Sequence, residues 1–140
     1  MPGRLFRGIK RLLGNASIKR LLVFDHPFRL VALITPILIK IREKIEAKLG
    51  SDTDFNVHLG RPVLFEGHDS SKNDLALSRL SEASRYAGIN VLSFYPEPVA
   101  ATLSYLHEER GLRNGRVLTL DFGGGTLDLS VVKFNDLTFD

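Results

Sequence analysis

Alternation between helix-like and strand-like segments constrains the fold more than any other feature of this sequence. From residue 36 onward, stretches with apolar side chains at helical spacing alternate with short apolar runs. Helices are predicted over about residues 36–49, 73–87 and 97–109, and strands over about residues 55–59 and 89–94. Because strands separated by a helix run parallel, this order predicts an α/β fold with parallel strands joined by crossover helices.

Capping residues and apolar spacing set the expected ends and faces of these helices. Thr35 is a candidate N-cap for the first helix, Pro36 suits its first position and Gly50 suits its stop. We expect this helix to bury residues spaced four apart, namely Ile37, Ile41, Ile45 and Leu49. We expect the second helix to bury Leu77, Leu80, Ala83 and Ala87 before it ends at Gly88.

The first 35 residues form a basic segment before this alternation begins. Six lysines and arginines precede the first acidic residue, Asp25, and apolar residues lie among them at helical spacing. We interpret this stretch as a surface helix with a basic face rather than as a targeting or membrane-surface helix. A short strand is predicted at residues 21–24, ended by Asp25, His26 and Pro27.

The composition excludes several classes of protein. The 140 residues include no cysteine, which excludes a disulfide scaffold, a zinc ribbon and a cysteine nucleophile and fits a cytoplasmic protein. The 19 basic and 16 acidic residues give a net charge of +3, too small an excess to predict nucleic acid as a partner. The longest apolar run, residues 30–39, is far shorter than the ~20 residues that a membrane helix needs, so no membrane partner is expected.

The C-terminal part changes character and predicts an antiparallel hairpin. Two apolar runs, residues 116–121 and 126–134, are separated by a link too short for a crossover. We expect the first of these strands to be buried. We place a domain boundary before the hairpin, so that residues 1–114 form one lobe and residues 115–140 begin a second.

The link of this hairpin has the composition of a phosphate-binding turn. Gly123, Gly124 and Gly125 can take positive φ and bring backbone N–H groups against an anion. Asp121 can hold Mg²⁺ through its waters, and the Thr126 hydroxyl can donate to a phosphate oxygen. On these residues alone, an ordinary glycine-rich hairpin remains the alternative interpretation.

Four segments extend this interpretation, in this order along the chain. They are FRGIKRLLG (residues 6–14), EAKLG followed by RPVLF (46–50 and 61–65), AGINVL followed by PEPVAAT (87–92 and 96–102), and DFGGGTLDLS (121–130). Together they resemble the seventy-kilodalton heat-shock chaperone family, within the actin and sugar-kinase ATPase superfamily. The resemblance implies a partial actin-like (ribonuclease H-like) ATPase domain of a divergent, bacterial-type member.

The resemblance also implies roles for individual residues, with ATP or ADP and Mg²⁺ as cofactors. Lys10 would orient the attacking water, and Glu97 and Asp121 would contact the hydration shell of Mg²⁺. The β- and γ-phosphates would be bound by Gly123, Gly124, Gly125 and Thr126. Pro62 would act as the family's relay between nucleotide and substrate domains, and unfolded polypeptides would be clients of the full-length protein.

Departures from the family pattern qualify these expectations. The first phosphate-binding hairpin and the adenosine-binding motif of the family have no counterpart in the 140 residues. We therefore expect a fragment that binds nucleotide weakly or not at all by itself. The strand at residues 55–59 would have an open edge that permits self-association. The alternative hypothesis is a non-catalytic remnant that acts as an interaction or regulatory module.

Overall fold

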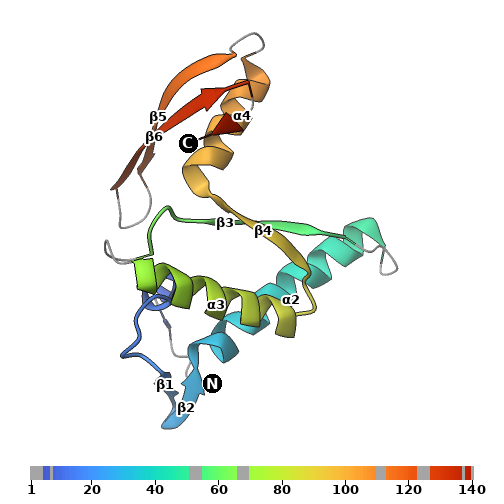
Figure 1. The fold of residues 1–140 in the computed structure, drawn as a ribbon. Helices are drawn as coiled ribbons and strands as arrows, with labels where there is room; N and C mark the ends of the chain where they lie inside the picture. Colours follow the sequence, from blue (N-terminus) through green and yellow to red (C-terminus); the bar gives the residue numbers. More distant parts are fainter. Residues whose placement is uncertain are drawn as a thin grey trace. The chain divides into compact units, whose positions relative to one another are not determined.

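The computed structural model describes residues 5–6, 8–50, 55–65, 70–109, 113–122, 127–136 and 138–139 (Figure 1). The chain divides into two compact units, which we call unit 1 (residues 1–58 and 64–93) and unit 2 (residues 59–63 and 94–140). The helices and strands are α1 (Ile9–Leu12), β1 (Arg20–Val23), β2 (His26–Arg29), α2 (Leu30–Leu49), β3 (Val57–Arg61), α3 (Ser70–Tyr86), β4 (Val91–Pro96), α4 (Glu97–Glu108), β5 (Asn114–Phe122), β6 (Leu127–Asn135) and β7 (Thr138–Phe139).

The predicted crossover is present as β3, α3 and β4. The two strands are hydrogen-bonded neighbours in a two-stranded sheet (Figure 1). The side-chain amide of Asn90 donates to that of Asn56 (3.1 Å), and His58 Nδ1 lies 2.6 Å from Ser93 Oγ. Residue numbers therefore rise together along both strands, which makes the pair parallel. The α/β fold is confirmed, with the element ends shifted by a few residues from the prediction.

Helix α2 begins six residues before the predicted start at Pro36. Residue 36 instead lies inside the helix, where its ring removes one backbone hydrogen bond. Thr35 does not act as the N-cap, since its hydroxyl donates to the Val31 carbonyl one turn earlier (2.8 Å). The apolar run before Pro36 is helical because its side chains fill the core of unit 1.

The buried stripe of α2 also differs from the predicted one. The buried residues of this helix are Leu30, Val31, Ile34 and Leu38. Ile37, Ile41 and Leu49, expected inside, are exposed, Ile37 by 55%. Leu30, Ile34 and Leu38 have the same four-residue spacing as the predicted set, so the periodicity of the sequence is compatible with either face. Packing against α3 determines which face of α2 is buried, and Figure 1 shows α3 beside α2.

The residues predicted as one short strand form a hairpin instead. Strands β1 and β2 are antiparallel, and Phe24 and Asp25 make the turn with φ of 48° and 65°. Two positive φ values fit a two-residue hairpin turn. Pro27 pairs with Leu22, one step beyond the hydrogen-bonded pair next to the turn. At that position a proline costs no ladder hydrogen bond, so it does not end the sheet.

The core of unit 1 lies mainly between α2 and α3. Its buried members are Leu13, Val31, Ile34, Leu38, Phe65, Ala76, Ala83, Ala87 and Ile89. Ala76 and Ala83 are completely buried, and their small side chains let the two helices approach closely. The predicted face of the second helix is confirmed, since Ala83 and Ala87 are buried and Leu77 and Leu80 pack against the same core.

Replacing Gly88 with alanine should lower the free energy of unfolding by about 1–2 kcal/mol, the usual cost of a left-handed residue with a Cβ. Gly88 follows α3 with a φ of 69°, and an added Cβ would meet the Arg42 guanidinium. That guanidinium donates to the Ala87 carbonyl (3.3 Å) and would be displaced. Urea unfolding measures the loss. Gly60→Ala is the control, because its Cβ would lie 3.6 Å from Glu97 Cγ, an ordinary contact; equal losses would contradict this account.

Unit 2 contains a three-stranded antiparallel sheet of order β5-β6-β7, with α4 against β5 and β6. The predicted hairpin is confirmed, and its nine pairs run from Asn114↔Asn135 to Phe122↔Leu127. Val132 and Phe134 are buried on one face. The expectation of a buried first strand is wrong, since the other face exposes Leu118, Leu120, Phe122, Leu127, Leu129 and Val131. One helix covers only one face of a sheet, so the alternate residues stay uncovered.

No helix among the described residues is long and apolar enough to cross a membrane. The predicted domain boundary at residues 114 and 115 stays a prediction.

Candidate functional site

The β5–β6 hairpin carries the most informative part of the candidate site. Asp121 is paired with Asp128, and Phe122 with Leu127, which makes these the last two pairs before the link. Asp121 is exposed, and Phe122 has 81% of its surface accessible. Residues 123–126, to which phosphate binding was assigned, lie outside the described residues. The hairpin therefore presents the Asp121 carboxylate to solvent, two residues before the glycines.

Glu97 is the first residue of α4. Pro96 precedes it in an extended conformation (φ −57°, ψ 130°), and Pro98 follows within the first turn, where its missing N–H costs nothing. An acidic side chain is stabilised at this end of a helix by the helix dipole. Glu97 is half-buried and its stem lies near Gly60 of β3. It shares unit 2 with Asp121, and the helix that begins at Glu97 packs against the strand that carries Asp121.

Lys10 lies in unit 1, within the single turn of α1, and its side chain is exposed. The basic N-terminal helix that we expected is thus confined, in the described residues, to four residues. The residues that follow Lys10 are fixed on α3. Leu13 is buried in the core, and a Cβ on Gly14 would lie 2.9 Å from the Lys72 carbonyl oxygen, so only glycine fits there.

Arg79 of α3 is the strongest anchor of this N-terminal segment. Its Nη1 donates to the carbonyls of Leu12 (3.3 Å), Leu13 (2.8 Å) and Asn15 (3.0 Å), and its Nη2 donates to that of Ile18 (2.8 Å). Sequence reasoning missed this residue. A signal was available, since Arg79 lies on the helical face of Ala76 and Ala83, where a cation needs a buried partner.

The turn after β3 is held by its own arginine. Arg61 Nη1 donates to the carbonyls of Pro62 and Val63, each at 3.0 Å. Pro62 is half-buried within this turn. Its expected role as a relay stays a prediction.

Among the described residues of unit 1, the groups with shifted pKa values are Arg29 and Glu82, which form an ion pair, and the half-buried Arg79. Arg29 Nη1 and Nη2 donate to the two carboxylate oxygens of Glu82 at 2.9 and 2.7 Å. This two-fold hydrogen bond, more than the Coulomb attraction, lowers the pKa of Glu82. Burial lowers the pKa of the Arg79 guanidinium, and the nearby positive charge of Arg29 lowers it further.

Within the part of the chain that the structure describes, no three His, Asp or Glu side chains are close enough together to hold a metal ion by themselves. Mg²⁺ does not need such a cage, because it keeps several waters and uses one or two carboxylates together with phosphate oxygens. The exposed Asp121 and the half-buried Glu97 carry suitable donors for that arrangement.

Comparison with known families gives one finding. The family model described as "Hsp70 protein" matches residues 15–140. The matched part contains Pro62, Glu97, Asp121 and residues 123–126, whereas Lys10 lies before it. The match covers most of the chain, and the α/β crossover followed by an antiparallel hairpin agrees with a partial actin-like ATPase domain. The chain therefore belongs to the Hsp70 family.

Proposed function

We propose that this chain forms part of an ATP-binding, ATP-hydrolysing domain of a molecular chaperone. The main support is the hairpin register, which ends at Phe122↔Leu127 and leaves residues 123–126 as the link, inside the part matched by the family. Glycines in such a link allow backbone N–H groups to approach phosphate oxygens. This is the chemistry that the Asp121 to Thr126 run favours.

The carboxylates have separate tasks in this proposal. Asp121 would hold the hydrated Mg²⁺ of the nucleotide and would accept a proton from the attacking water. Glu97, at the start of α4, would hold the same hydrated ion. Bound Mg²⁺ supplies charge neutralisation for the phosphates. Thr126 donates to a phosphate oxygen, and Lys10 orients the water and stabilises negative charge on the γ-phosphate.

Titration with Mg-ATP tests the proposal directly. We expect the backbone amide signals of residues 121–128 to shift and to become protected from hydrogen exchange, because N–H groups in the link would donate to phosphate oxygens. Amide signals of the last two turns of α2, residues 43–49, serve as an internal control and should not respond. No change at millimolar nucleotide would contradict nucleotide binding and favour the alternative, a non-catalytic interaction or regulatory module.

A further inference from the structure

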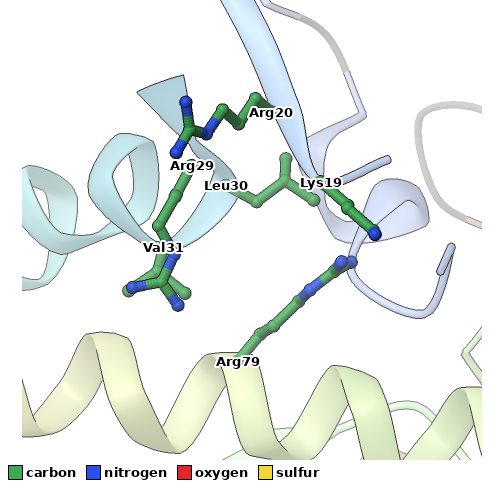
Figure 2. A pocket seen from close by; sticks show the side chains of 6 residues that line it. All are labelled: Lys19, Arg20, Arg29, Leu30, Val31 and Arg79. Atoms are coloured by element: carbon green, nitrogen blue, oxygen red, sulfur yellow. The ribbon is translucent and has the colours of Figure 1, made fainter. Parts of the chain in front are cut away.

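A pocket of about 350 Å³ in unit 1 is lined mainly by cationic side chains (Figure 2). Its lining residues are Lys19, Arg20, Arg29, Arg79, Leu30 and Val31. They come from the beginning of β1, the junction between β2 and α2, and the middle of α3. None of these lining residues is acidic, so four positive charges surround a space with no negative charge in its wall.

This arrangement is electrostatically unfavourable for the protein alone. Arg20 and Arg29 are direct cross-strand partners, and like charges at such positions repel. Arg79 lies close enough to Arg29 for the two charges to repel as well. Glu82 offsets only Arg29, through the pair described above. Within the described residues, Lys19 and Arg20 have no ion pair or side-chain hydrogen bond. The pocket thus keeps a net positive charge.

We propose that this pocket binds a small anion that carries two or more linked phosphate groups. Guanidinium groups match phosphate oxygens with paired donors. Arg20 offers such a pair, since its side chain has no hydrogen bond among the described residues. Arg29 and Arg79 already donate to Glu82 and to four backbone carbonyls, and they contribute mainly their positive charge. In Figure 2 the ends of Lys19 and Arg79 point toward one another, while Arg20 and Arg29 lie on the other side of Leu30. Cations on both sides of Leu30 favour an anion whose negative charges are spread over more than one phosphate group.

The size of the pocket supports the same class of ligand. Water occupies about 30 Å³ per molecule in the liquid, so 350 Å³ corresponds to about twelve waters. That is more room than the five heavy atoms of one phosphate group need. Leu30 and Val31, at the start of α2, complete the lining of the pocket.

The test uses inorganic phosphate, pyrophosphate and tripolyphosphate, titrated without nucleotide or Mg²⁺ at constant ionic strength. We expect affinity to rise in that order, with amide shifts at residues 19–20 and 29–31. The double variant Lys19→Gln/Arg20→Gln should weaken tripolyphosphate binding at least tenfold. The matched control, Lys44→Gln/Lys48→Gln on the exposed side of α2, removes the same charge and should change binding less than twofold.

Two results would overturn the proposal. Equal weakening by the two double variants would mean diffuse attraction to a basic protein, and absent binding by the unchanged protein would mean that there is no site. Because linked phosphates also suit the proposed nucleotide site, the same titration follows the amide signals of residues 121–122 and 127–128. We expect these to stay unchanged; shifts there without shifts at residues 19–20 and 29–31 would place the anion at the hairpin instead. The experiment therefore tests anion binding in this pocket separately from the proposed function.

Discussion

Replacing Arg79 with alanine should lower the free energy of unfolding by about 2–4 kcal/mol. Hydrogen bonds from a charged donor are worth about 1.5–3 kcal/mol each, but the four that Arg79 makes share one side chain and do not add. Water would replace part of them, because the Asn15 end of the segment is exposed. Urea unfolding gives the loss, and faster hydrogen exchange over residues 12–18 should accompany it.

The same helix offers a matched control for this prediction. Arg85 is exposed, and its guanidinium lies 4.8 Å from the centre of the Tyr86 ring, a contact worth about 0.5–1 kcal/mol at an exposed site. Arg85→Ala should therefore cost less than about 1 kcal/mol. Arg79→Lys keeps the charge but loses the fork of donors, so it should restore only part of the stability. If the alanine variants at 79 and 85 were equally stable, the anchoring role of Arg79 would be refuted.

The second large effect is expected from Asp121→Asn. We expect Mg²⁺-dependent nucleotide binding to weaken at least tenfold, because the neutral amide no longer attracts the hydrated ion. In a protein completed with the family's first phosphate-binding hairpin and adenosine-binding motif, hydrolysis should fall about 100-fold or more, the usual cost of losing one group that stabilises charge in a transition state. Calorimetric titration with and without Mg²⁺ measures the first effect, and phosphate release measures the second. The free energy of unfolding should not fall, since Asp121 is exposed and its cross-strand partner, Asp128, carries the same charge.

Asp136→Asn makes the same chemical change in the same sheet. Asp136 is exposed in the turn after β6, beyond the end of the ladder farthest from the glycine link, and its φ of 42° suits asparagine as well as aspartate. We expect this variant to bind Mg-nucleotide as the unchanged chain does. Similar losses in the two variants would show that net charge, and not the position of Asp121, governs binding.

The sequence predicted the elements that carry the candidate site, but it did not predict the long-range contacts that hold the N-terminal segment in place. The strands on both sides of residues 123–126 and the helix beginning at Glu97 were predicted at nearly their observed positions. Arg79 and its four carbonyl partners were not, because the partners lie more than 60 residues away in the chain. The cation pocket was missed for the same reason, since α3 and the two strands of a hairpin supply its charges.

The sequence predicted the local structure correctly at positions where a glycine or a proline determines the backbone conformation by itself. Gly88 follows the end of α3, Pro98 lies in the first turn of α4, and the short glycine-rich link requires β5 and β6 to run antiparallel. The sequence could not predict the structure where two arrangements of apolar residues fitted the same periodicity. The start of α2, its buried stripe and the exposed face of the hairpin depended on which neighbouring element covered which apolar side chains. Burial is a property of the packed molecule, because it is set by contacts between segments far apart in the chain.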